Sequence, residues 1–341
     1  MASPFFLNEN MTKLAIVGAT GAVGVEILKL LQEREFPVEE IRLFASEHSA
    51  GKKLNFKKQK VVVEKFFPGC FKGLDLVLLS AGSLVSEQIC PKIIKEGATA
   101  IDNSSAFRYD SKVPLVVPEI NPQKIKPGII ANPNCSTIQM LMVLKPIYDN
   151  FGIEQLVIST YQAVSGSGYK AITELNNQLN AFARGEKIIP RIYEKQIAYN
   201  AIPKVDRFIG NGYTKEEMKM VWETHKIFDD TSIKVTATAV RIPVIIGHSE
   251  SVFVKTKNKV NIFRVKEVLH DFEGVQVVDN SSDDFPTALD SVNTDKVLVG
   301  RIRKDLFDPT AINLWIVANN LRKGAALNAV QIAEKYREKY L

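Results

Sequence analysis

The sequence predicts an α/β protein with two domains, an N-terminal domain built on a parallel sheet and a C-terminal α+β domain with a mixed sheet. Short apolar runs alternate with amphipathic segments over residues 13–131, a pattern typical of strands joined by crossover helices. The later half instead shows long alternating strands joined by few helices. The length of 341 residues provides enough chain for two hydrophobic cores.

Composition excludes several classes of protein. The net charge of +6 comes from scattered Lys and Arg, which favours small anionic ligands and argues against nucleic acid. Cys70, Cys90 and Cys135 form no CxxC pair, so we expect no disulfide, no metal site and a reducing, cytoplasmic compartment. No apolar run approaches the roughly 20 residues that span a bilayer. Residues 1–10 lack the features of a signal peptide, and we expect a disordered leader there.

A glycine-rich turn follows the first predicted strand, residues 13–17, and opens a helix over 22–32. Gly18 permits a tight turn, Gly21 lets a phosphate approach the backbone, and Gly24 allows close packing of helix on strand. The N-terminus of the helix would face a pyrophosphate. The alternative is a plain strand–helix turn. We favour a Rossmann-like dinucleotide site.

The end of the second predicted strand, residues 41–45, bears on cofactor choice. An acidic residue at this place binds the ribose 2′-hydroxyl of NAD, whereas polar and basic residues accept the 2′-phosphate of NADP. Ser46, Ser49 and Lys52 favour the phosphate, and Glu47 is ambiguous. The sequence therefore predicts NADP.

Two further strand ends carry candidate ligand residues. The strand at 75–79 runs into Ser80, Ala81 and Gly82, small residues that fit a cofactor crevice. Arg108 comes just past the strand at 98–101, where open α/β sheets place ligands. A solvated surface arginine is the alternative for Arg108.

Cys135 is the candidate nucleophile. It lies between an apolar run at 128–131 and a predicted helix at 136–148, with Asn134 and Ser136 as suitable N-cap types. Unpaired N–H groups and the dipole at a helix N-terminus favour a thiolate, which is the reactive form. A small buried cysteine is the alternative.

The second half offers partners for that thiol. A strand at 156–161 ends at Gln162, and a flexible loop is expected at 163–168. His248 follows a glycine between two strand-like runs, as a structural group or as the base that Cys135 needs. Glu216 and Lys219 lie three apart on a predicted helix, where the alternative is an ion pair on a solvated face.

Together these motifs resemble aspartate-β-semialdehyde dehydrogenase of the bacterial type. The resemblance runs from about Leu14 to Glu334, and its most specific parts are NPNCSTIQ and RIPVxxGHSES. The matching stretches are VGATGAVG (17–24), SAGK (49–52), DNSSAFR (102–108), VPEIN (117–121), NPNCSTIQ (132–139), YQAVSGSG (161–168), VRIPVIIGHSESV (240–252), VGRIRKD (299–305) and NLRKGAALNAVQIAE (320–334).

The resemblance implies a role for each matching residue. Cys135 would be the nucleophile, His248 the general acid/base, and Gln162 would hold the substrate. The substrate's phosphate, ammonium and carboxylate would be bound by Arg108, Lys219, Glu216 and Arg241. The cofactor would be bordered by Gly18, Thr20, Gly21, Ala22, Val23, Ser46, Ser49, Ser80, Ala81, Gly82, Ser165, Gly166 and Asn320. His48 stands where the family often has an arginine beside the 2′-phosphate.

The resemblance also implies the architecture of glyceraldehyde-3-phosphate dehydrogenase and NADPH-dependent reduction of L-aspartyl phosphate to the semialdehyde with release of phosphate. The pathway would supply lysine, threonine, methionine and diaminopimelate. We expect an NADP-binding domain at 11–133, a catalytic and dimerisation domain at 134–319, and a C-terminal helix at 320–341 packing on the first domain. The chain would form a homodimer or a pair of dimers. Alternatives are another acyl-phosphate reductase of this architecture or a catalytically silent binding relative.

Overall fold

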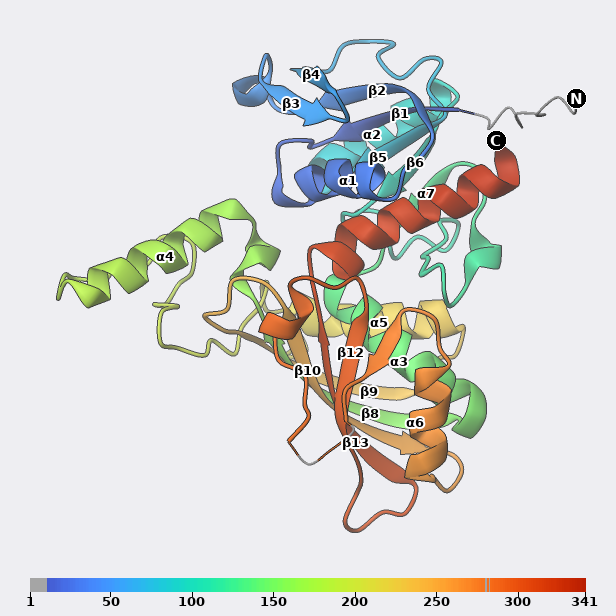
Figure 1. The fold of residues 1–341 in the computed structure, drawn as a ribbon, viewed down its shortest axis with the longest axis vertical. Helices are drawn as coiled ribbons and strands as arrows, with labels where there is room; N and C mark the ends of the chain where they lie inside the picture. The colour runs from blue at the N-terminus through green and yellow to red at the C-terminus, as the bar shows by residue number, and fades with distance from the viewer. Residues whose placement is uncertain (1–10, 280, 282) are drawn as a thin grey trace, which may run out of the picture. The chain divides into compact units, whose positions relative to one another are not determined.

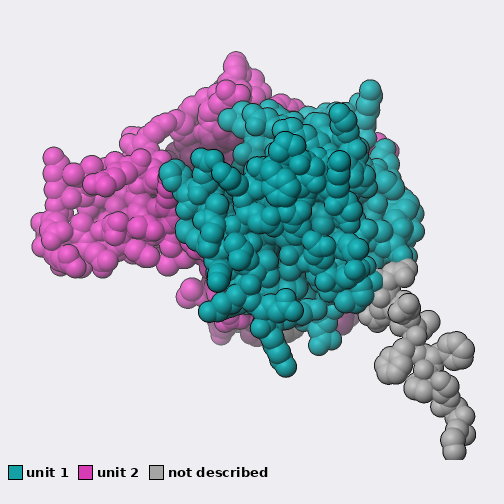
Figure 2. Space-filling view, turned by 90° about the horizontal axis from the view of Figure 1, so that it is seen from above, with its two compact units in different colours: residues 1–114, 123–132, 329–341 teal, residues 115–122, 133–328 magenta. Residues whose placement is uncertain are grey.

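The computed structural model describes residues 11–279, 281 and 283–341, so the expected leader at residues 1–10 lies outside the described residues. The chain divides into two compact units (Figure 2). Among the described residues, unit 1 takes residues 11–114, 123–132 and 329–341, and unit 2 takes those within 115–122 and 133–328. Each unit has its own sheet and its own buried core.

Unit 1 is built on a sheet of seven strands among the described residues, in the order β3-β4-β2-β1-β5-β6-β7. All pairs are parallel except β3 with β4. The helices of this unit include α1 (Ala22–Glu33) and α2 (Ser83–Lys95) (Figure 1). The strands are β1 (Thr12–Val17), β2 (Val38–Phe44), β3 (Lys53–Phe56), β4 (Gln59–Glu64), β5 (Leu76–Leu79), β6 (Thr99–Asp102) and β7 (Ile129–Ala131).

The central strands of unit 1 are apolar because both of their faces are covered. All four residues of β5 are buried, and two of them, Val77 and Leu79, belong to a core cluster that also includes Val17 and Phe44. Stabilisation therefore comes from burial of these side chains, at about 25 cal/mol per Å² of apolar surface removed from water. This packing confirms the predicted parallel sheet.

Unit 2 is built on a mixed sheet of six strands among the described residues, in the order β11-β12-β13-β10-β8-β9. Strand β10 is antiparallel to both neighbours, whereas β8 and β9 are parallel. The strands are β8 (Ile153–Gln162), β9 (Lys234–Arg241), β10 (His248–Thr256), β11 (Val275–Val277), β12 (Val297–Lys304) and β13 (Ala311–Ala318). The helices include α3 (Cys135–Phe151), α4 (Tyr169–Ala183), α5 (Lys215–Phe228) and α6 (Ile262–His270) (Figure 1). The predicted mixed sheet is confirmed.

Helix α3 is the central element of unit 2. Every residue from Ser136 to Leu144 is buried, and the helix packs on α5, α6 and strands of the sheet. Ser136, Thr137 and Gln139 are the polar residues of this buried run, and the others are apolar. Since Cys135 is the first residue of α3, this packing fixes the place of the candidate nucleophile.

The chain end differs from the single helix expected at 320–341. A π turn at Arg322–Ala326 precedes α7 (Leu327–Tyr340). Residues 320–328 belong to unit 2 and residues 329–341 to unit 1. The side chain of Asn320 accounts for part of this division, because it hydrogen-bonds to Gly247 and Ser165 of unit 2. Residues 115–122, expected in the first domain, also belong to unit 2.

Candidate active site

The glycine turn of unit 1 has room only for glycine at two positions. A Cβ on Gly18 would lie 2.8 Å from the carbonyl oxygen of Ser80, and one on Gly24 would lie 2.2 Å from that of Gly18. Gly18 also has φ +82°, a conformation that other residues rarely adopt. The turn therefore brings the end of β1, the start of α1 and the end of β5 close together.

The N-terminus of α1 is suited to an anion. Gly21 is its N-cap, and no side chain caps the first turn, which includes Ala22 and Val23. Backbone N–H groups at such a terminus bind phosphate together with the helix dipole. The hydroxyl of Thr20 lies 3.3 Å from that of Ser49, so the predicted cofactor-selecting loop lies beside the glycine turn. Ser46 is the N-cap of the short 3₁₀ turn that contains Ser49.

Arg108 also belongs to unit 1. It is buried rather than solvated, and its Nη2 donates to the carbonyl oxygen of Asn103 at 2.8 Å. The loop that carries it is held by Asp102, whose carboxylate accepts from Ser86, from Ser104 N–H and from the Ser104 hydroxyl. The alternative of a solvated surface arginine is therefore wrong.

Cys135 stands at the start of α3 in unit 2, as predicted. Asn134 is the N-cap residue, but its side chain does not cap the helix. Its Nδ2 instead donates to Glu216 at 2.8 Å, and its backbone N–H donates to Glu223 at 2.7 Å. Two buried carboxylates of α5 thus hold the residue that precedes the thiol. The Cys135 thiol lies 3.9 Å from Asn134 Oδ1.

Glu216 is the centre of a buried polar cluster. Its Oε1 accepts from Asn134 and from Gln162, and its Oε2 pairs with Lys219 at 2.7 Å. Burial alone would raise the pKa of Glu216, but the charge of Lys219 and the three donors outweigh it and lower the pKa to about 2. The predicted pair of Glu216 and Lys219 does form, yet on a buried face and not a solvated one.

Gln162 connects this cluster to α3. Its Nε2 donates to the hydroxyl of Ser136 at 2.5 Å as well as to Glu216 at 2.9 Å. Its Oε1 is buried and has no hydrogen-bond partner among the described residues. A buried amide oxygen without a donor costs free energy, so this atom is an available acceptor for a ligand.

The peptide group of Ala163 positions both His248 and Arg241. Its N–H donates to His248 Nδ1 at 3.0 Å, and its carbonyl oxygen accepts from Arg241 Nη1 at 2.6 Å. Because Nδ1 accepts, the proton of the neutral imidazole is on Nε2. That Nε2 is buried and has no hydrogen-bond partner in the described part of the chain.

Electrostatics keep His248 neutral. Burial, followed by the positive charge of Arg241, lowers the pKa of His248 to about 3, although Glu216 acts in the opposite direction. At neutral pH the ring therefore presents an N–H donor at Nε2. A Cβ on Gly166 would lie 3.2 Å from Arg241 Nη1 and 3.4 Å from His248 Nε2, so Gly166 leaves open the space in front of both side chains.

Unit 2 thus brings together Cys135, Gln162, Glu216, Lys219, Arg241 and His248, all predicted from sequence. It also includes Ser165, Gly166 and Asn320 from the predicted cofactor set. The expected flexible loop at 163–168 contains a 3₁₀ turn, Val164–Ser167, and Asn320 Nδ2 donates to the hydroxyl of Ser165 at 2.9 Å. Sequence reasoning missed the Ala163 peptide group and Glu223, for which no motif gave a signal.

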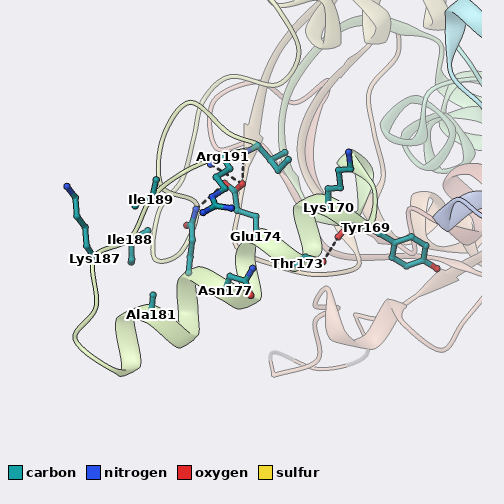
Figure 3. A pocket seen from close by; sticks show the side chains of 12 residues that line it. Tyr169, Lys170, Thr173, Glu174, Asn177, Ala181, Lys187, Ile188, Ile189 and Arg191 are labelled. Atoms are coloured by element: carbon teal, nitrogen blue, oxygen red, sulfur yellow. Dashed lines mark hydrogen bonds between the residues drawn. The ribbon is translucent and has the colours of Figure 1, made fainter. Parts of the chain in front are cut away.

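Unit 2 has a groove away from this cluster. It has a volume of about 510 Å³ and lies between α4 and residues 187–192 (Figure 3). Buried Glu174 accepts N–H groups of Arg191 and Ile192 there, so the groove is explained by the attachment of that segment to α4. Within the described residues, no group of acidic, His and Cys side chains could hold a metal ion, and no helix could cross a membrane.

Comparisons with known proteins identify the family of this chain. Residues 13–127 match the family "Semialdehyde dehydrogenase, NAD binding domain", and residues 144–323 match "Semialdehyde dehydrogenase, dimerisation domain". The chain is 52% identical over 331 residues to aspartate-semialdehyde dehydrogenase of Aquifex aeolicus, covering 94% of this chain and 97% of that relative.

Solved structures show the same likeness. Aspartate semialdehyde dehydrogenase II of Vibrio cholerae, complexed with ASA, matches with a TM-score of 0.94 and 48% identity, covering 97% of this chain and all of that one. Aspartate semialdehyde dehydrogenase with NADP from Candida albicans matches with a TM-score of 0.74 and 26% identity over 96% of this chain and 98% of that one. This chain therefore belongs to the aspartate-semialdehyde dehydrogenase family of oxidoreductases.

Proposed function

We propose that this chain catalyses the NADPH-dependent conversion of L-aspartyl-4-phosphate to L-aspartate-4-semialdehyde and phosphate, through a thioester on Cys135. The enzyme would serve biosynthesis of lysine, threonine, methionine and diaminopimelate. The observation that carries the proposal is the clustering, within unit 2, of a helix-terminal thiol with buried Gln162, Glu216, Arg241 and His248.

The chemistry of the cluster matches the substrate. L-Aspartyl phosphate carries a carboxylate, an ammonium and a phosphate. We assign the carboxylate to Arg241, because guanidinium donors match a carboxylate in a bidentate fork. We assign the ammonium to Glu216 and to Gln162 Oε1, which lacks a donor among the described residues. Lys219 and Arg108 supply the positive charges for the phosphate.

The first half of the reaction is acyl transfer to Cys135. The thiolate attacks the acyl carbon, the carbon–oxygen bond to phosphate breaks, and a thioester remains on the sulfur. Backbone N–H groups at the start of α3 and the Nε2–H of His248 are the donors that we assign to the developing oxyanion. The neutral tautomer set by Ala163 suits this donating role.

The second half releases the aldehyde. The residues of unit 1 fit a dinucleotide, because the glycine turn and the uncapped N-terminus of α1 provide a cradle for its phosphates. When bound, NADPH supplies the hydride that reduces the thioester carbonyl. The alkoxide oxygen re-forms the carbonyl, the carbon–sulfur bond breaks, and the departing Cys135 thiolate accepts a hydrogen bond from the Nε2–H of His248. In the opposite direction His248 would take the thiol proton at Nε2, which requires the tautomer with its proton on Nδ1 and the loss of the hydrogen bond from Ala163 N–H.

For the cofactor we propose NADP over NAD. Ser46 and Ser49 follow β2, and the Thr20–Ser49 contact places the Ser49 hydroxyl beside the glycine turn. Two hydroxyls at this place suit the 2′-phosphate.

For the assembly we propose a homodimer formed through the region that matches a dimerisation domain. Light scattering at micromolar protein should give twice the chain mass, and a monomer at that concentration would contradict the proposal.

The experiment is phosphate-dependent reduction of NADP⁺ or NAD⁺ with L-aspartate-4-semialdehyde, followed by absorbance of the reduced cofactor. We expect turnover with NADP⁺ that requires phosphate, and much less with NAD⁺. Comparable use of NAD⁺ would overturn the cofactor assignment alone. Absence of turnover with both cofactors would overturn the proposed reaction.

A further inference from the structure

The segment before α7 is wound as a π turn, Arg322–Ala326. Ala326 N–H donates to Leu321 O at 3.0 Å, and Gly324 N–H donates to Asn319 O at 3.2 Å. Both bonds span five residues. Such turns are rare and are often found at functional sites. An irregular turn of this kind needs tertiary contacts to hold it.

The π turn lies directly against the candidate nucleophile. A Cβ built on Gly324 would lie 2.9 Å from Cys135 Cβ and 3.4 Å from its Cα. Real Cβ atoms essentially never approach that closely. The backbone of Gly324 therefore packs directly against Cα and Cβ of Cys135.

The same segment also contacts the residue before His248. Asn320 Oδ1 accepts from Gly247 N–H at 3.0 Å, and Asn320 Nδ2 donates to Ser165 Oγ at 2.9 Å. The five residues from Asn320 to Gly324 thus touch Gly247, just before β10, at one end and Cys135 at the other. A shift of this stretch would move both.

A buried ion pair fixes the segment. Lys323 is 2% exposed, and its Nζ lies 2.8 and 2.7 Å from the two carboxylate oxygens of Glu119. The same Nζ donates to Asn328 Oδ1 at 3.0 Å, while Asn328 Nδ2 donates to the carbonyl oxygen of Val116. All four residues belong to unit 2. Because a buried charge without its partner is strongly unfavourable, the turn cannot slip by one residue and leave Lys323 away from Glu119.

We propose that Lys323 is a positioning residue of the active site, whose buried ion pair with Glu119 locks the π turn in the register that seats Gly324 against Cys135. The inference rests on the proposed function only in taking Cys135 as the nucleophile. Lys323 contacts neither substrate nor cofactor in this account. Its effect reaches the reaction through the backbone of Gly324.

The first test removes both charges at once. Lys323→Met alone would leave the Glu119 carboxylate buried without its cation, so the variant is Lys323→Met with Glu119→Gln, since neutralising a buried pair together is often tolerated. The matched control is Lys255→Met with Asp308→Asn, which removes a half-exposed pair of the same unit.

The main readout is the rate at which iodoacetamide alkylates Cys135 as a function of pH, with neither substrate nor cofactor present. Cys70 and Cys90 are buried, and Cys135→Ala provides the blank. We expect the double variant to change this rate profile and to lower kcat by roughly 10- to 100-fold, the loss typical of a misplaced reacting group. The KM for NADP⁺ and the unfolding cooperativity should stay near those of the control.

The second test is Gly324→Ala, with Gly210→Ala as control, since a Cβ at Gly210 would meet nothing within 4 Å. We expect Gly324→Ala to reproduce the altered alkylation profile, because the new methyl group presses on Cys135. An unchanged profile and kcat in both Gly324→Ala and the folded double variant would overturn the proposal. Lowered stability with an unchanged profile would overturn it too, as a purely structural role. Alkylation of Cys135 does not need turnover. It therefore tests the positioning role of Lys323 independently of the wild-type turnover assay, which tests the proposed reaction.

Discussion

The two candidate sites of this protein are made in opposite ways. In unit 1 the turn at residues 18–24 is local in sequence and works through the absence of side chains, because Cβ atoms at Gly18 and Gly24 would collide with carbonyl oxygens. In unit 2 the cluster draws buried polar side chains from positions as distant as Asn134 and His248, joined by hydrogen bonds and charges. The glycine turn of unit 1 requires room for close backbone approach, and the cluster of unit 2 requires hydrogen-bond and charge partners.

This difference determines what a substitution does. Adding a methyl group in the turn disturbs packing and cofactor binding. Removing a partner in the cluster leaves a buried charge or donor unsatisfied, which costs more than the bond itself contributed. Changes in unit 1 should therefore affect stability and cofactor affinity, whereas changes in unit 2 should affect chemistry and pH dependence.

The largest expected effect follows from Cys135→Ala. Without the sulfur no thioester forms, so kcat should fall by roughly 10⁴-fold or more, as removal of a nucleophile does elsewhere. The dissociation constant for NADPH, measured by fluorescence titration, should stay within about twofold because the cradle of unit 1 is untouched. Turnover above that of a mock purification would remove Cys135 from its assigned role.

Arg241→Lys should give the second-largest effect. Lysine keeps the charge but loses the planar fork and the second donor, so kcat/KM for the semialdehyde should fall by roughly 10- to 100-fold, the equivalent of one charge-assisted hydrogen bond. The KM for NADP⁺ should change little. Steady-state kinetics in both substrates check this, and equal losses for the two would place Arg241 outside the substrate site.

Gly24→Ala tests the glycine turn of unit 1. Its Cβ would lie 2.2 Å from the carbonyl oxygen of Gly18, against 3.3 Å for a Cβ on Gly21. Overpacking of this kind costs about 1–3 kcal/mol, so Gly24→Ala should lower the thermal midpoint more than Gly21→Ala. The alkylation rate of Cys135 should not change. Equal midpoints for the two variants would show that the turn tolerates a side chain.

The smallest shift that we predict is in the pH dependence of stability, and Glu216→Gln tests it. The folded-state pKa of Glu216 is lowered to about 2 from 4.5, so its contribution is present above the unfolded pKa and is lost as pH falls toward the folded pKa. Urea unfolding at pH 6 and pH 3.5 should show the wild type losing about 1 kcal/mol more than the variant.

The control for that prediction lies in unit 1. Glu64 pairs with Arg42 in a partly exposed bridge, so Glu64→Gln should alter the same pH difference by less than about 0.5 kcal/mol. If the wild type and Glu216→Gln lose the same unfolding free energy between pH 6 and pH 3.5, the carboxylate of Glu216 is not stabilised by the buried cluster.

The sequence predicted the two sites to different depths. The glycine turn could be located because its chemistry lies within seven residues between a strand and a helix. The residues of the cluster could be named through the family resemblance, yet their contacts could not, since they depend on how β8, β9, β10 and α5 pack. The Ala163 peptide group illustrates this limit, because a backbone group has no residue type to recognise.

The predicted start of the C-terminal helix was wrong for the same reason. The sequence from Asn320 onward has a helical pattern, but hydrogen bonds of Asn320 and close packing at Gly324 produce a π turn and delay α7 to Leu327. The buried Lys323 could not be foreseen either, since its partner Glu119 is distant in the sequence. Tertiary contacts decided both outcomes.

The most direct measurement of the central claim is intact and peptide mass spectrometry of the enzyme incubated with L-aspartate-4-semialdehyde and NADP⁺ in the absence of phosphate. Without phosphate as acceptor the acyl group should accumulate on the protein. We expect one aspartyl group per chain, located on Cys135, removed by adding phosphate and absent from Cys135→Ala. An aspartyl group on another residue, or active enzyme that never carries one, would contradict it.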